Sequence, residues 1–434
     1  MIFARFGAVL VLLVWLAPAG LAAPAGKRLT LTEALAAAAE AHPDLQLAEA
    51  ERSAALAEQE AVASRSDLAV NFEAGLRRGH PSTDSSVSLS DNSLRLNARK
   101  NLYDFGRTAL SGQAAQAVVD AREATLLDAR ERRRIEVMAR FFGVLVADMQ
   151  LGADTEYMAV AYVSADHGRD YFRLGQISAA ELAELEHRYQ ERLVRRNASQ
   201  ARARIARAQL ANAMNQPGQL PADLADPELV ANNLTVPDYE VLLPAMMERN
   251  SRLRAQLALL DASRQRMEAS RAEYSPILDA EVEAAGYSRE AVTRDNLKAG
   301  VVLTWPLYQG RRVSAQLARE QAQFHRLQAE ADKLRMGLAE ALLEVWSEIG
   351  QLQRSVRAAA RQQVAYRDLA LEKARGQYEV ELKADLGDAM AATMEAKLRQ
   401  RSTEYQLALA FARLQALLGG PLDSITGMAN RSPR

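Results

Sequence analysis

The feature that most constrains the fold is an apolar seam in the last third of the sequence, where hydrophobic residues step by three and four. No proline occurs between Pro306 and Pro421 to break a helix there. We therefore expect a helix over about residues 311–376, roughly 100 Å long at 1.5 Å per residue. A helix of this length cannot fold around one globular core. The seam consists of Phe324, Leu327, Ala331, Leu334, Leu338, Leu342, Val345, Ile349, Leu352 and Val356.

The sequence is duplicated once, around a proline-rich linker. Leu102–Arg107 corresponds in order to Leu307–Arg312, and Tyr171–Gly175 corresponds to Gln377–Glu381. Two copies of about 200 residues are too long for a solenoid repeat, so they are structural halves. Each half is predicted to contain a helix, two strands and two very long helices. We predict a signal peptide over 1–25, a first repeat over 26–212, a linker over 213–244, a second repeat over 245–420 and a disordered tail over 421–434.

The first 25 residues are typical of a targeting segment. They carry Arg5, then an apolar run from Phe6 to Leu16, then small residues and proline. This run is too short to cross about 30 Å of hydrocarbon as a helix, so it favours a secretory signal peptide over a membrane anchor. No later segment has the roughly 18 consecutive apolar residues of a membrane helix.

Four short segments alternate between apolar and polar residues, which predicts strands with one apolar and one charged face. Each segment approaches the roughly 9–11 residues that a tilted membrane strand needs. A half-buried soluble hairpin would show the same alternation. Aromatic residues near the strand ends (Trp305, Tyr103 and Tyr308) favour a membrane, because aromatic side chains prefer its interface. The apolar positions are Val70, Phe72, Ala74 and Leu76; Leu94, Leu96 and Ala98; Leu278, Ala280, Val282 and Ala284; and Leu297, Ala299, Val301, Leu303 and Trp305.

The number of strands has a consequence for assembly. Single-chain membrane barrels begin at about eight strands, so four strands cannot close one. Open sheet edges are excluded from lipid because their backbone groups would have no hydrogen-bond partners. If the strands lie in a membrane, we expect several chains to share one barrel.

The composition excludes several classes of function. The chain has no cysteine, which rules out disulfides, thiolate metal sites and a cysteine nucleophile. Its 54 basic and 55 acidic residues give a net charge of −1, which argues against a dedicated nucleic-acid binder. The five histidines lack metal-ligand spacing, and no phosphate loop or nucleophile motif appears. We therefore expect no enzyme, no metal site, no cofactor and no nucleic-acid partner.

Over about residues 28–420 the sequence resembles the TolC family of outer-membrane efflux proteins, the outer-membrane factors. The resemblance implies a mainly α fold with a small β part, in which long antiparallel coiled-coil helices accompany four membrane strands per chain. It also implies a trimeric α/β barrel, with twelve shared strands and a long helical tunnel. The matching segments are Leu29–Leu35 with His42-Pro43-Asp44-Leu45, the junctions Leu102–Arg107 and Pro306–Arg311, and a closing helix from Tyr405 to Gly419.

The function implied by the resemblance is passive export. The chain would be a duct in the outer membrane of a Gram-negative bacterium, with a large periplasmic part. It would work with a periplasmic adaptor and an inner-membrane pump, in a tripartite efflux or type I secretion system. The residues alone also allow a secreted, soluble coiled-coil structural protein with surface hairpins.

The resemblance also assigns roles to residues at the turns between the long helices. Leu174-Gly175-Gln176 and Val380-Glu381-Leu382 correspond to the tips on which an adaptor docks. The second tip departs from the family pattern, because Glu381 stands where a glycine is expected. A glutamate at positive φ would be strained, which puts docking at that tip in question.

The closing latch of the family maps onto three residues near these turns. Tyr378 and Lys383 would donate hydrogen bonds to Glu181. Glu181 also fits a capping box with Ser178, and the two roles are compatible. Asp385 and Asp388 are possible acids of the aperture.

Overall fold

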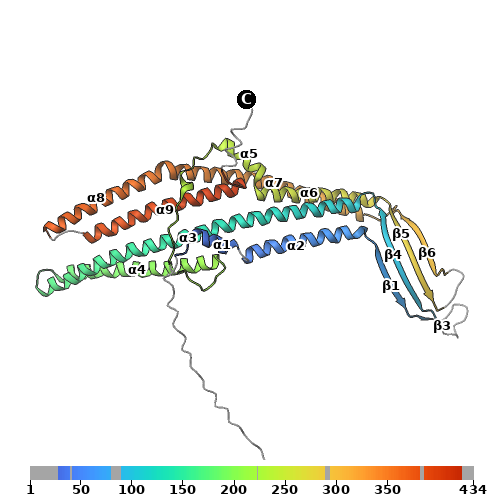
Figure 1. Cartoon of the computed structure of the whole chain (residues 1–434), viewed down its shortest axis with the longest axis horizontal. Helices are drawn as coiled ribbons and strands as arrows, with labels where there is room; N and C mark the ends of the chain where they lie inside the picture. Colours follow the sequence, from blue (N-terminus) through green and yellow to red (C-terminus); the bar gives the residue numbers. More distant parts are fainter. Residues whose placement is uncertain are drawn as a thin grey trace, which may run out of the picture.

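The computed structural model describes residues 28–39, 42–79, 89–221, 223–288, 294–381 and 386–422. The molecule is elongated, with an antiparallel sheet at one end and two helical hairpins at the other (Figure 1). The predicted signal peptide (residues 1–25) and nearly all of the predicted tail lie outside the described residues. The observed fold is therefore long helices with a small sheet, as the sequence predicted.

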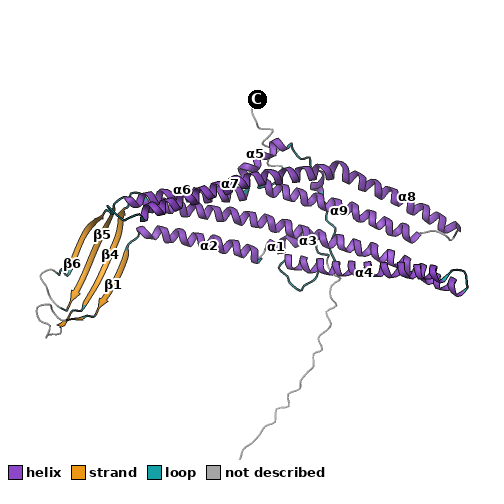
Figure 2. Cartoon of the chain, turned by 180° about the vertical axis from the view of Figure 1, so that it is seen from behind, coloured by secondary structure: helices purple, strands orange, loops and turns teal. Residues whose placement is uncertain are grey.

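Two very long helices run along the molecule (Figure 2). In the first repeat, α3 extends without a break over Arg107–Arg173. In the second repeat, α7 (Arg312–Gln351) continues through a π-helical turn (Leu352–Val356) into α8 (Arg357–Glu381). The predicted long helix after residue 311 is confirmed, and most of its apolar seam is buried. The buried seam residues are Leu327, Ala331, Leu338, Leu342, Val345, Ile349 and Leu352.

The π-helical turn has a counterpart in the sequence. The stretch from Arg312 to Glu381 is one residue longer than the corresponding stretch from Arg107 to Gly175. A π turn takes up an extra residue within an α-helix, so it absorbs this excess and lets the seam continue on the same face. Arg354 Nε donates to the Gly350 carbonyl (3.2 Å), which helps to satisfy the irregular turn.

Shorter helices complete the two repeats. They are α1 (Leu31–Ala39), α2 (Pro43–Ala63), α4 (Ala179–Ala213), α5 (Tyr239–Arg249), α6 (Ser251–Arg271) and α9 (Leu386–Leu418), with short 3-10 helices at Ser64–Ser66, Val230–Asn233 and Ala272–Tyr274. Beside the sheet the helices lie in the order α2, α3, α6, α7. Toward the other end the order is α4, α3, α9, α8. The two lateral edges of the chain are therefore α2 and α7 beside the sheet, and α4 and α8 toward the tips.

The main sheet has the strand order β1-β4-β5-β6, and all neighbours are antiparallel. Its strands are β1 (Ala69–Gly75), β4 (Ser93–Tyr103), β5 (Ile277–Tyr287) and β6 (Leu297–Thr304). Two short strands, β2 (Arg78–Gly79) and β3 (Leu89–Ser90), pair beyond it. The sheet joins both repeats, because β4 comes from the first and β5 from the second. Within the described residues β1 and β6 are its open edges.

The buried core lies in the middle of the molecule, where the linker crosses the helices. One cluster joins α5, α6, α7 and α9 through residues such as Met246, Leu342 and Phe411. The other joins α1, α3, α4 and α9, where Phe142 and Tyr405 stack with ring centroids 4.7 Å apart. These clusters fasten the two repeats together and leave the sheet and the hairpin tips at the ends.

Candidate functional site

The sheet has one apolar face, as the alternation predicted. Apolar residues oppose one another on this face across all four strands, with Lys100 as the one charged exception: Phe72 opposes Leu96, and Val282 opposes both Ala98 and Ala299. These side chains are exposed, with Phe72 at 68% and Val301 at 61%. An exposed apolar surface of this kind marks a contact with lipid or protein.

The other face carries charged residues that pair with one another. Arg99 Nη2 lies 2.5 Å from Asp279 Oδ2, and Asn101 Nδ2 donates to Asp279 Oδ1 at 3.1 Å. Lys298 Nζ lies 3.3 Å from Glu283 Oε2. On the central strands these residues are less exposed than the apolar ones, so the sheet curls toward its charged side. This arrangement suits lipid outside and water inside.

Aromatic side chains gather where the strands meet the helices. Trp305 and Tyr308 are exposed just beyond β6, and the Tyr103 and Phe105 rings meet edge to face at 4.8 Å. Phe105 has φ 55°, a left-handed conformation that is unfavourable for an aromatic residue. Asp104 precedes α3, and its Oδ2 accepts a hydrogen bond from Thr108 N in the first turn of that helix at 2.7 Å. The sequence located this junction but did not reveal the backbone strain at Phe105.

The first hairpin tip is a tightly ordered turn. The amide of Gln176 donates to the Tyr171 carbonyl at 2.8 Å, and that of Gly175 to the Phe172 carbonyl at 2.9 Å. This is the Schellman pattern, and Gly175 adopts the left-handed conformation that it requires, at φ 71°. Leu174, on the same turn, is 70% exposed. The predicted docking tip Leu174-Gly175-Gln176 therefore projects from the molecule as a rigid turn.

Glu181 belongs to the cap of α4. Its Oε2 accepts a hydrogen bond from Ser178 N at 2.7 Å, and its own amide donates to Ser178 Oγ at 3.2 Å. Hydrogen bonding to the carboxylate by the backbone amide of Ser178, and next by its side chain, holds the pKa of Glu181 below its ordinary value. In the described part of the chain Glu181 has no other polar partner. The cap is present, and it uses only one of the two carboxylate oxygens.

The second tip is described only in part. Leu382, Lys383 and Asp385 lie outside the described residues, as do the side chains of Val380 and Glu381. The backbone of Glu381 is the last residue of α8, so the left-handed strain considered for this position does not arise. Tyr378, on α8, is 46% exposed. Asp388 is exposed in the first turn of α9.

The proposed latch residues lie at opposite lateral edges of the chain. Glu181 is on α4 and Tyr378 is on α8, while α3 and α9 lie between these helices. Hence one chain does not bring Glu181 and Tyr378 together. Two neighbouring copies, with the α4 edge of one against the α8 edge of the next, could do so.

A cluster that the sequence did not reveal joins the two hairpins within one chain. Tyr157 on α3 donates its hydroxyl to Glu395 Oε2 on α9 at 3.2 Å. Arg192 on α4 lies over the Tyr157 ring, 4.5 Å from its centroid. Burial and Glu395 raise the pKa of Tyr157. No sequence signal links Tyr157 with Glu395, because contacts between distant residues leave no periodic pattern.

Gly387 packs against α3 of the neighbouring hairpin. A Cβ atom at this position would overlap Cγ2 of Val160 on α3. No pattern in the sequence indicated this packing role for Gly387. A groove of about 370 Å³ beside it is bordered by Tyr157, Arg192 and Asp388.

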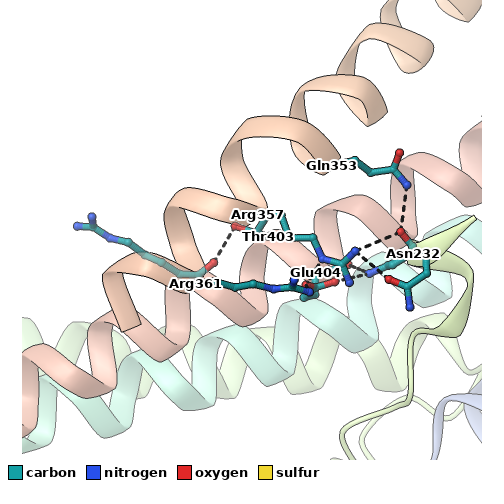
Figure 3. A network of polar contacts seen from close by, with 8 residues as sticks. Asn232, Gln353, Arg357, Arg361, Thr403 and Glu404 are labelled. Atoms are coloured by element: carbon teal, nitrogen blue, oxygen red, sulfur yellow. Dashed lines mark hydrogen bonds and ion pairs between the residues drawn. The ribbon is translucent and has the colours of Figure 1, made fainter. Parts of the chain in front are cut away.

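Polar contacts at the π-helical turn fasten the linker to the helices (Figure 3). Gln353 Nε2 donates to the carbonyls of Asn232 (3.0 Å) and Leu234 (2.9 Å). Arg357 Nε and Asn232 Nδ2 donate to the two carboxylate oxygens of Glu404, at 2.7 and 2.8 Å. Hydrogen bonds therefore hold the linker against the π-helical turn and α9.

The described residues lack two features, a membrane-spanning helix and a metal-binding cluster. None of the helices there combines the length and the apolar character that crossing a membrane requires. The same part of the chain contains no group of three or more His, Cys, Asp or Glu side chains placed to hold a metal ion.

Comparison with known proteins supports the resemblance seen in the sequence over the second half of the chain. Residues 242–420 match the family described as outer membrane efflux protein. No curated protein matches the chain. Among solved structures, the chain is similar to VceC of Vibrio cholerae, with a TM-score of 0.72, 16% identity, and coverage of 90% of this chain and 96% of that one.

Two other outer-membrane channels share the fold. The CmeC channel of Campylobacter jejuni gives a TM-score of 0.74 at 13% identity, covering 90% of this chain and 85% of that one. The open-state structure of the MtrE channel of Neisseria gonorrhoeae gives 0.70 at 18% identity, covering 90% and 89%. The expected fold class is confirmed. The matched family and these three solved structures are all described as outer-membrane proteins.

Proposed function

We propose that this chain is an outer membrane efflux protein and forms one protomer of a trimeric export duct. The observation that carries the proposal is the two-faced sheet with two open edges. Lipid cannot satisfy the unpaired backbone groups of β1 and β6. Three copies would supply twelve strands and close the ring, with the charged faces turned toward a wet lumen.

The helical edges support the same assembly. On the outer side of α4, Val194 and Ile205 are exposed, and on α8 Tyr366 and Leu369 are exposed. These two helices are the lateral edges of the chain at the tip end. In a closed ring of copies the α4 edge of one protomer packs against the α8 edge of the next, which buries both apolar stripes.

The same arrangement gives the latch a physical basis. Glu181 of one protomer would face Tyr378 and Lys383 of its neighbour across this seam. Its Oε2 holds the helix cap, and Oε1 is free to accept the latch bonds. The ring would then be held closed at its tip by three symmetry copies of one contact. Asp385 and Asp388 would lie near the aperture that this contact closes.

We infer that the hairpin tips dock a periplasmic adaptor, through which an inner-membrane pump of a tripartite efflux or type I secretion system delivers cargo. The projecting Schellman turn at Gly175, with an exposed Leu174, is the contact surface that supports this role. The chain would be a passive conduit whose opening is set at the helical tip.

The test is the size and location of the purified protein. The full chain should fractionate with the outer membrane and migrate in detergent as a trimer by light scattering. In a planar bilayer it should form channels of low conductance. A chain that stays monomeric while its circular dichroism shows intact strands would contradict the shared sheet. Solubility without detergent would favour the secreted coiled-coil protein instead.

A further inference from the structure

Lys100 lies on the apolar face of the sheet. In the strand register it opposes Ala280, which in turn opposes Val301. Leu96 and Ala98 precede it on the same face. Among the described strand residues of this face, Lys100 is the one with a charge. The side chain is exposed, and none of the described carboxylates lies within ion-pair distance of it.

Two basic residues of the opposite face, Arg99 and Lys298, differ from Lys100 in having acidic partners. Arg99 pairs with Asp279, and Lys298 pairs with Glu283 at 3.3 Å. Lys100 is on an inner strand, so no sheet edge brings a neighbouring chain to it. Its charge therefore has no partner in the sheet, and a partner must come from whatever covers the apolar face.

The position of Lys100 along the strand fits the boundary of a membrane. It precedes Tyr103 by three residues, about 10 Å along β4 at 3.3 Å per residue, or about 7–8 Å of depth at the usual tilt of 35–45°. Aromatic residues at that end of the sheet, including Trp305 and Tyr308, suit the interface. A lysine stem can lie along apolar surface while its ammonium group reaches the headgroups.

We propose that Lys100 binds the phosphodiester of an anionic phospholipid in the leaflet nearest the helices. The proposal rests on the proposed function, because it requires that the apolar face meets lipid. The ammonium donates to phosphate oxygens, and the aliphatic stem packs over Ala280 and the neighbouring apolar side chains. Lys100 would thereby set the depth at which the sheet sits.

The test is lipid-selective quenching of a reporter beside Lys100. Ala280→Trp places an indole directly opposite it on the same face. Trp15 and Trp305 are replaced by Phe, which leaves Trp346, whose indole is bound to the Pro237 carbonyl in the helical part. The full-length protein is reconstituted in vesicles with brominated phosphatidylglycerol or brominated phosphatidylcholine at equal total bromine.

We expect phosphatidylglycerol to associate about fivefold more strongly than phosphatidylcholine, the factor for one basic group at an anionic surface. Lys100→Gln should reduce the ratio to about one. Lys298→Gln is the matched control, since it removes the same side chain from the opposite face, and it should leave the ratio unchanged.

The failures are distinguishable. Equal quenching by both lipids with Lys100 present would overturn the lipid site while leaving the sheet in the membrane. A loss of selectivity on adding inorganic phosphate would show that free phosphate occupies the group, and would also overturn the lipid site. If neither lipid quenches the reporter, the sheet does not lie in the membrane, and this result would overturn the proposed function itself.

Discussion

A charge at the centre of the apolar face should prevent assembly. Val282 is the most direct position, because it opposes Ala98 and Ala299 in mid-sheet and is 45% exposed. Val282→Arg would place a guanidinium in hydrocarbon, at a cost of about 2–4 kcal/mol near the bilayer midplane. A trimer repeats the change three times, for about 6–12 kcal/mol. This is comparable to the whole stability of a typical domain, so we expect insertion to fail.

A control on the charged face separates lipid exposure from general damage. Asn97 opposes Glu283 in the register, so Asn97→Arg adds the same side chain beside an acid. It is preferable to Glu283→Arg, which would set a new base beside Lys298. Both proteins are refolded into phospholipid vesicles, and the inserted fraction is measured by protease protection of the sheet. Equal losses in Val282→Arg and Asn97→Arg would refute the assignment of the two faces.

Three further predictions concern the tip and the start of the helices. Tyr378→Phe combined with Lys383→Ser should raise single-channel conductance several-fold, because it removes the latch donors; unchanged conductance would assign Glu181 to the cap alone. Gly387→Leu should weaken the packing of α9 on α3, since even a Cβ atom there overlaps Val160, and hydrogen exchange at the hairpins should rise; unaltered exchange would contradict the close packing. Burial, and next the charge of Arg133, lower the pKa of His42 from its ordinary value of 6.5, and its Nδ1 accepts a hydrogen bond from Asp44 N. As the pH falls, the unfolded chain therefore binds a proton at His42 before the folded chain does. The free energy of unfolding should consequently fall as the pH drops below 6.5. His42→Gln should reduce this dependence in urea titrations, and an identical pH profile would show that His42 does not contribute.

The long helices and the strand faces could be predicted because each leaves a periodic trace. The seam from Leu327 to Leu352 has helical spacing over many turns, and the strand residues alternate with period two. The π-helical turn left only an indirect trace in the sequence, the one extra residue between the matched segments of the second repeat. Its position depends on the linker, since Gln353 binds the carbonyls of Asn232 and Leu234.

The contacts at the candidate site could not be predicted from the sequence. Contacts such as Tyr157 with Glu395 join residues far apart in the chain, and only the lateral order of the helices brings them together. The same order explains the separation of Glu181 from Tyr378, which a residue-by-residue comparison with a family does not convey. The backbone strain at Phe105 was also not predicted, because no pattern of residue types indicates a positive φ at an aromatic residue.

In the proposed trimer the edge strands β1 and β6 of neighbouring chains pair and close a ring of three. The chain has no cysteine, so introduced cysteines can report this contact alone. We would place one cysteine on β1, at Val70 or Phe72, and one on β6, at Ala299 or Val301, and oxidise the protein in its native membrane. Edges that pair bring suitable combinations within the roughly 4.4–6.8 Å between Cα atoms that a disulfide needs. Denaturing gels should then show linked dimers and trimers and nothing larger. Absence of linked species for every combination, or a ladder that continues beyond three chains, would contradict the ring.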